Sequence, residues 1–298
     1  MNQHAKLVAL LVLLGAGWGA TQPLSKVAVS QGYQPFGLIF WQLAMGAVFM
    51  ASLLAIRRQP LPKQPKHLRI YVIIALIGTV LPNSASFQAI AHLPSGIISI
   101  LLSLVPMFAF PIALLLAVDH FSWRRLLGLC FGAIGILALI GPEASLPERG
   151  MLLFIPLALV APLFYGLEGN VVAKWGTAGL DAIQVLAGAS LVGAVIALPL
   201  ALLSGQWIDP RPPWGAPDIA HVASSLIHVI VYATYVWLVG VAGAVFAAQV
   251  SYLVTGFGVL WAILFLGERY SGYIWIAFLA MLIGLYFVQP RHKESVND

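Results

Sequence analysis

The sequence has few charged residues and only one cysteine. Charged side chains make up 8% of its 298 residues, against about 25% in soluble globular proteins. This scarcity excludes a soluble globular fold. The single cysteine, Cys130, excludes an internal disulfide and a CxxC metal or redox site. The densest group of basic residues, between 57 and 69, has no aromatic residues among it for stacking bases, so we predict no binding of nucleic acid.

The sequence also lacks the common motifs of catalysis. It has no P-loop lysine motif, so ATP is not expected to drive this chain directly. It has no HExxH, no GxSxG and no clustered pair of carboxylates, and its ionisable residues are scattered. We therefore predict a protein that is not an enzyme and that holds no cofactor and no metal.

Long apolar runs dominate what is present. Hydrophobic residues make up 61% of the chain. A membrane-spanning helix needs roughly 20 apolar residues, so ten spans would use about 200 and leave no room for a separate soluble domain. The predicted fold is an all-α polytopic membrane protein with ten transmembrane helices. The spans are expected at 7–29, 36–56, 69–91, 95–118, 123–140, 151–175, 181–204, 218–239, 242–266 and 272–289.

The positions of Lys and Arg predict the orientation, because successive connections face alternate sides of the membrane. One side carries only Lys26, Arg149, Arg211 and Arg269. The side of the N-terminus carries the other eleven, which are Lys6, Arg57, Arg58, Lys63, Lys66, Arg69, Arg124, Arg125, Lys174, Arg291 and Lys293. By the positive-inside rule, both termini are expected in the cytoplasm and the protein in the inner (plasma) membrane.

The two halves of the chain are related by an internal repeat. Asp119 and Glu268 each follow a long apolar run and lie 149 residues apart. The pair Gly135 and Gly284 keeps this offset. An offset of half the chain indicates duplication of a unit of five spans, expected at residues 1–142 and 150–290. Because five is odd, the second copy must be inverted in the membrane, which is typical of transporters.

The segment GWGATQPLSK, residues 17–26, together with Asp119 and Glu268, makes the chain resemble the EamA-type branch of the drug/metabolite transporter superfamily. The resemblance implies two five-helix halves around a central cavity, and export of amino acids, drugs or other small metabolites, with proton coupling suspected. Asp119 departs from the Glu that is usual in the family. Glu168, an acid inside the sixth span, is also unusual for it.

Glu168 is the only carboxylate well inside a predicted span. An ionised carboxylate there costs at least a few kcal/mol unless it faces a cavity or finds a partner. We interpret it as the leading proton-coupling residue or as an anchor for a substrate ammonium. The alternative is a neutral packing residue that is hydrogen-bonded to Asn170 or to a neighbouring helix.

Two further spans carry polar and aromatic residues on one helical face. In the eighth span, Ser224, His228, Tyr232 and Tyr235 follow a helical spacing. His228 is a second proton-coupling candidate, and the tyrosines could stack on a flat substrate. The alternative is a hydrogen-bonded seam between helices. In the first span, Trp18 and Gln22 could line the cavity, although simple packing also explains Trp18.

The third, fourth and ninth spans complete the predicted cavity, together with the first, sixth and eighth. Pro106 and Pro111 free carbonyl groups in the fourth span, and Gly256 and Gly258 weaken the ninth. For the fourth and ninth spans, the alternative is that small residues only permit close packing, which is our interpretation of the fifth and tenth spans. For the amides of the third span, the alternative is hydrogen bonding between helices. The candidate residues in the third, fourth and ninth spans are Asn83, Gln88, Ser99, Ser103, Gln249 and Tyr252.

Taken together, these patterns predict a secondary transporter that exports amino acids or related polar or amphipathic compounds by alternating access. Its expected partners are a small-molecule substrate and the lipid bilayer. Small-residue faces on the fifth and tenth spans could pack within one chain or between two, so a monomer and a homodimer both remain open. The alternative functions are import of a vitamin-like heterocycle, and, in a different class, a lipid flippase subunit or a lipid-modifying membrane enzyme.

Overall fold

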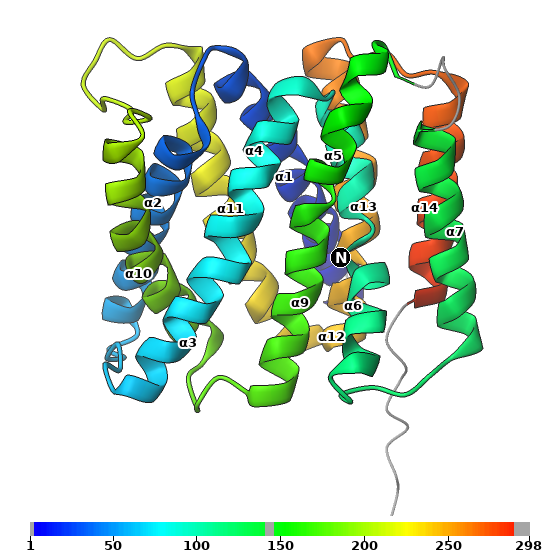
Figure 1. Ribbon diagram of the computed structural model, residues 1–298. Coiled ribbons are helices and arrows are strands. Elements are labelled where there is room, and N and C mark those ends of the chain that lie inside the picture. Colours follow the sequence, from blue (N-terminus) through cyan, green and yellow to red (C-terminus); the bar gives the residue numbers. More distant parts are fainter. Residues whose placement is uncertain (1–2, 141–145, 289–298) are drawn as a thin grey trace, which may run out of the picture.

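The computed structural model describes residues 3–140 and 146–288, and every regular element in these ranges is a helix (Figure 1). Within these two ranges, nine helical segments are long and apolar enough to cross a membrane, and the shorter apolar helix Gly272–Val288 makes the tenth. The all-helical, ten-span prediction is confirmed. Five spans are α1 (Gln3–Ser30), α2 (Pro35–Ile56), α7 (Trp123–Ile140), α10 (Ala182–Leu203) and α11 (Ala216–Ala242).

The other spans include four that consist of shorter segments. The third is α3 (Pro65–Ala75), η1 (Leu76–Val80) and α4 (Leu81–His92). The fourth is α5 (Ser95–Leu102) and α6 (Val105–Leu115), and the sixth is η2 (Arg149–Phe154), α8 (Ile155–Ala158) and α9 (Val160–Trp175). The ninth is α12 (Ala244–Ala248) and α13 (Val250–Leu266), and the tenth is α14 (Gly272–Val288).

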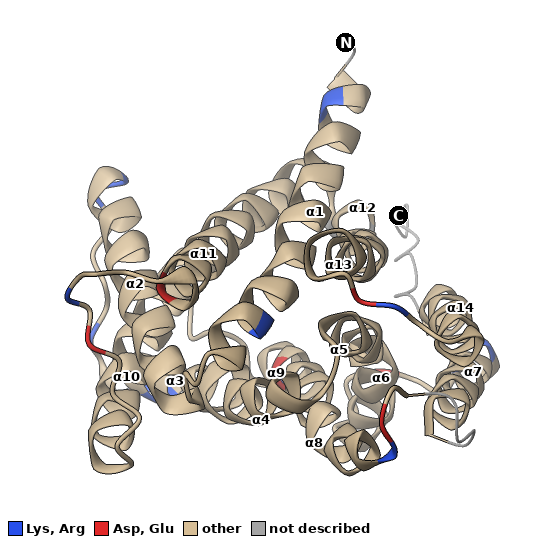
Figure 2. Cartoon of the chain, turned by 90° about the horizontal axis from the view of Figure 1, so that it is seen from above, with Lys and Arg blue, Asp and Glu red and all other residues tan. Residues whose placement is uncertain are grey.

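The ten spans form two central bundles and two outer pairs. Bundle A contains α1, α11, α12 and α13. Bundle B contains α4, α9 and the span α5–α6, of which α6 packs on α9 and α5 packs mainly on α13 of bundle A. The outer pairs are α2 with α10 and α7 with α14, on opposite flanks of the molecule when it is seen from above (Figure 2). Each bundle and each pair takes helices from both repeats. The repeat-related helices α1 and α9 run in opposite directions, as two inverted repeats require (Figure 1).

Small residues set the closest contacts between helices. A Cβ atom on Gly128 of α7 would lie 2.8 Å from the carbonyl oxygen of Gly284 of α14, and a Cβ on Gly284 would lie equally close to the carbonyl oxygen of Gly128. In the same way, a Cβ on Gly19 of α1 would lie 2.8 Å from the backbone nitrogen of Gly258 in α13. The small-residue faces of the fifth and tenth spans therefore pack against each other within one chain.

Irregular turns interrupt several of these segmented spans. The third contains the π-helical turn Leu76–Val80. The fourth is interrupted at Ser103 and Leu104, just before Pro106, where the backbone bonds reach three residues back. The ninth is interrupted at Gln249. Such interruptions inside a bilayer are tolerated where protein or a water-filled cavity surrounds them.

The two ends of the bundles are packed differently. At the end where α4 turns into α5, apolar residues of both bundles, such as Val29, Ile97 and Val259, belong to one continuous core. At the opposite end, which carries the basic loop 57–68, bundle A has a separate core that includes Leu11 and Leu238. The bundles are therefore closed on each other at the α4–α5 end and have separate cores at the basic end.

Candidate functional site

A central cavity of about 420 Å³ lies between the two bundles. Its lining residues come from eight spans, and among the described residues none comes from α7 or α14. The six spans predicted from the sequence all contribute. The second and seventh spans contribute as well, through Gln42 and Ser190. This volume is in the range of sites for small molecules.

Glu168 supplies the only carboxylate among the described residues of the cavity wall, and that wall contains no Lys or Arg. It extends from α9 and, within the described parts of the chain, has neither a hydrogen bond nor an ion pair. The side-chain amide of Asn170 instead donates to the carbonyl oxygens of Ala109 and Gly166, at 2.9 and 2.8 Å. The interpretation of Glu168 as bonded to Asn170 is therefore wrong. Its carboxyl group therefore faces the cavity without a partner among the described residues.

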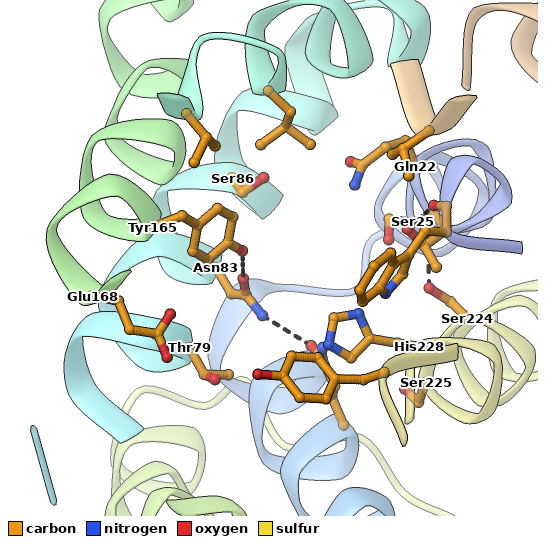
Figure 3. Close-up of a pocket in the computed structure, with 18 of the residues that line it drawn as sticks. Gln22, Ser25, Thr79, Asn83, Ser86, Tyr165, Glu168, Ser224, Ser225 and His228 are labelled. Atoms are coloured by element: carbon orange, nitrogen blue, oxygen red, sulfur yellow. Dashed lines mark hydrogen bonds between the residues drawn. The ribbon is translucent and has the colours of Figure 1, made fainter. Parts of the chain in front are cut away.

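A short hydrogen-bonded chain lies beside Glu168 (Figure 3). The hydroxyl of Tyr165 donates to Oδ1 of Asn83 at 2.8 Å, and Nδ2 of Asn83 donates to Oε1 of Gln42 at 3.0 Å. This chain connects the sixth, third and second spans. Asn83 was predicted, whereas Tyr165 and Gln42 were not. Tyr165 precedes Glu168 by three residues and therefore shares its helical face, a signal that could have identified it.

An aromatic cluster forms part of the opposite wall. The ring of Trp18 lies 6.1 Å from that of His228, 6.0 Å from Tyr232 and 5.4 Å from Tyr235, between ring centroids. Trp18, His228 and Tyr232 line the cavity, whereas Tyr235 contacts Trp18 without being part of the lining. Nε1 of Trp18 and Oε1 of Gln22, which also lines the cavity, are buried and have no hydrogen-bond partner among the described residues. Both atoms are available to a bound molecule.

Of the six candidates in the third, fourth and ninth spans, only Asn83 and Ser103 line the cavity. Gln88 is exposed, because five residues from Asn83 turn a helix by about 140°. Ser99 is buried one turn nearer the α4–α5 end, where α5 packs on Gly258 of α13.

The two candidates in the ninth span lie outside the wall for separate reasons. Gln249 is exposed at the interruption between α12 and α13. Tyr252 packs against the continuous apolar core that joins the bundles. The polar residues of this span that do line the cavity are Ser251 and Thr255.

His221 lines the cavity but was not among the residues predicted from the sequence. Its side chain is buried, and Nε2 has no hydrogen-bond partner in the part of the chain that the structure describes. It precedes His228 by seven residues, two helical turns, so both rings lie on the same side of α11. The polar stripe that was recognised in the eighth span begins one turn earlier than predicted.

Comparisons with known proteins identify the family. The model of the EamA-like transporter family matches residues 5–141 and 152–289. The uncharacterized transporter YoaV of Bacillus subtilis is 27% identical over 64% of this chain and 66% of its own length. A probable terminal-alkyne amino-acid exporter of Streptantibioticus cattleyicolor is 24% identical over 66% of this chain and 64% of its own. The chain thus spans just under two thirds of each of these relatives.

A solved crystal structure shares the fold, with a TM-score of 0.62 and 18% identity over 94% of this chain and 96% of that one. The family model covers most of the chain in two consecutive matches, which correspond to the two sets of five spans. The protein is therefore a multi-pass membrane protein, and it belongs to the EamA-like transporter family.

Proposed function

We propose that the protein is a secondary transporter that exports a small amine-bearing metabolite, with amino acids and related compounds the favoured class. The observation that carries this proposal is the single, unpartnered carboxylate of Glu168 in a cavity without Lys or Arg in its described wall. An ammonium group is the natural partner of such a carboxylate. The name of the Streptantibioticus relative, a probable amino-acid exporter, supports the same class.

The proposed direction depends on the orientation of the chain. The basic loop 57–68, the beginning of α7 with Arg124 and Arg125, and the end of α9 with Lys174 lie at the lower end of the molecule in Figure 1, and we assign this end to the cytoplasm by the positive-inside rule. Two other basic residues used in the prediction, Arg291 and Lys293, lie outside the described residues. With this orientation, the end with separate cores faces the cytoplasm. The cavity is then placed to receive a molecule from inside the cell.

Proton coupling is the proposed energy source. Glu168 can bind either a proton or a substrate ammonium, and this competition would couple the two movements. His228 is the second candidate, since its ring lines the same cavity and an imidazole nitrogen can accept or release a proton.

The experiment measures efflux of amino acids from proteoliposomes as a function of pH. Glu168→Gln keeps the shape of the side chain and removes its charge, so we expect transport to lose its pH dependence. The matched control is Glu148→Gln, which makes the same change on an exposed loop residue. Unchanged pH dependence in Glu168→Gln would remove Glu168 from the coupling role.

Import of a vitamin-like heterocycle is the second candidate, because the ring of Trp18 and its aromatic neighbours offer a surface for stacking. Direction separates the two functions: an exporter lowers the cellular content of its substrate, whereas an importer rescues an auxotroph. Membership of a transporter family weighs against a lipid-modifying enzyme or a flippase subunit.

A further inference from the structure

A lysine of bundle A binds the end of a helix in bundle B. Nζ of Lys26, near the end of α1, donates to the carbonyl oxygens of Ile90, Ala91 and Leu93, at 2.8, 3.1 and 3.1 Å. These carbonyl groups belong to the last turn of α4, where the helix leaves its acceptors unsatisfied. A cation at this position also complements the negative end of the helix dipole.

A glutamate of bundle A binds the beginning of the next helix in bundle B. Oε1 of Glu268, just after α13, accepts from the backbone nitrogen and the hydroxyl of Ser95 at 2.7 and 2.8 Å. Oε2 accepts from the backbone nitrogen of Gly96 at 3.1 Å and from the hydroxyl of Tyr270 at 2.6 Å. The carboxylate therefore caps the N-terminus of α5, where a negative charge is favoured.

Both contacts converge on one short turn. Only Leu93 and Pro94 separate α4 from α5, so Lys26 and Glu268 hold the two sides of the same connection. A side chain on Gly96 would collide with the hydroxyl of Tyr270, which shows how closely the parts are fitted. Burial and the hydrogen bond to Glu268 raise the pKa of Tyr270, so its hydroxyl remains a donor at neutral pH.

The repeat-related lysine does not join the bundles. Lys174 occupies the position in α9 that Lys26 occupies in α1, but its Nζ donates to the carbonyl oxygen of Leu116, at the end of α6 in its own bundle, at 2.9 Å. The cross-bundle lysine contact is therefore found at the closed end of the molecule, and its repeat counterpart at the other end stays within bundle B.

We propose that Lys26 and Glu268 form a releasable clamp on the α4–α5 turn, and that the closed end of the transporter opens only when this turn leaves both residues. Neither residue lines the cavity, so the clamp acts on the opening of the closed end and not on contact with a molecule in the cavity. The clamp would control opening of the α4–α5 end whatever the identity of the transported molecule and the direction of its transport.

The test uses a cysteine reporter under the clamp. Ser99 is 1% exposed and lies between α5 and α13, so Ser99→Cys can react with a maleimide only when the bundles separate. The native Cys130 is exposed and is first replaced by Ala. We expect Lys26→Met and Glu268→Gln each to speed labelling of the purified protein by about tenfold, the effect of ~1.4 kcal/mol at a partly buried helix end. In the double variant, labelling should be accelerated by less than the product of the two single accelerations, because both residues hold the same turn.

Two control variants repeat these changes away from the clamp. Lys174→Met removes the repeat-related lysine, and Asp209→Asn neutralises an acid that pairs with Arg211 in its own loop; neither should change the labelling. If Glu268→Gln does not fold, Tyr270→Phe is used instead. It removes one of the four described hydrogen bonds that the Glu268 carboxylate accepts, and it should speed labelling to a smaller extent. Lys26→Arg should restore the slow rate. The reference is the reporter protein that carries only Ser99→Cys and Cys130→Ala. If Lys26→Met and Tyr270→Phe label at the same rate as this reference, the proposal is overturned. Labelling needs no transport, so this failure is distinct from a failure of the proposed export.

Discussion

The carboxylate of Glu168 lies against the backbone of Gly78, across the interface between the sixth and third spans. A Cβ atom on Gly78 would be 2.6 Å from Oε1 of Glu168. Gly78 lies in the middle of the π-helical turn Leu76–Val80, a type of turn that is frequent at functional sites. The absent side chain thus provides the space that Glu168 occupies.

Gly78→Ala should therefore impair transport more than folding. The added methyl group meets the end of a flexible side chain, which can rotate away, so we expect a stable protein whose Glu168 is displaced. Transport should fall by roughly tenfold or more, which corresponds to ~1.4 kcal/mol. Efflux and thermal unfolding are measured on the same preparation. Gly240→Ala, in open space on α11, is the control, and equal transport by the two variants would contradict the expectation.

Asn83→Leu should destabilise the protein. Asn83 accepts from the Tyr165 hydroxyl and donates to Gln42, so its loss leaves two polar groups without their partner, at a cost of about 1–3 kcal/mol each when they are buried. The measurement is the unfolding midpoint in detergent. Gln88→Leu makes a similar change at an exposed position of the same helix and should have little effect. A midpoint for Asn83→Leu as high as that of the control would mean that the chain of bonds is not needed for stability.

Tyr33 should make the protein sensitive to alkali. Its hydroxyl donates to Oδ1 of Asp218 at 2.5 Å, and burial, with this hydrogen bond, raises its pKa from 10.0 to about 12. A raised pKa means that the folded state holds the proton more tightly, so the stabilisation is complete below pH 10 and is lost as the pH rises through about 12. Unfolding midpoints measured between these values should fall less steeply in Tyr33→Phe. Parallel curves for the two proteins would refute this linkage.

Gly128→Val should weaken the pairing of α7 with α14. The new side chain would meet Val288 and the backbone of Gly284, and overpacking of this kind costs about 1–3 kcal/mol. Because this face is used within the chain, the oligomeric state should not change. Thermal unfolding and light scattering of the purified variant measure the two effects. A change in mass without a loss of stability would place this face between chains instead.

Most of the fold was predictable because membrane spans depend on simple, local quantities. Hydropathy located all ten spans, and the offset between Asp119 and Glu268 revealed two repeats. The pairing of the spans was not predictable in this way. The contact of Gly19 with Gly258 joins the first span to the ninth, and small residues by themselves do not indicate which partner they face.

Only some of the residues that line the cavity were predictable from the sequence. Glu168 was identified because an acid in a span is costly wherever it points. Ser99 and Ser103 share one helical face, yet Ser103 lines the cavity and Ser99 is enclosed where the bundles meet. Periodicity gives the direction of a side chain around its helix, but it does not give the depth at which the bundles separate.

The exchange of helices between the repeats also has a consequence for biogenesis. α1 is made before the other helices described here, but its main neighbours are α11 and α13, which belong to the second repeat and are made late. In the same way, α2 must remain in the bilayer until α10 arrives, and α7 until α14. Several helices of the first repeat therefore have to persist without their main partners through much of translation, and truncated chains should be targets for membrane quality control.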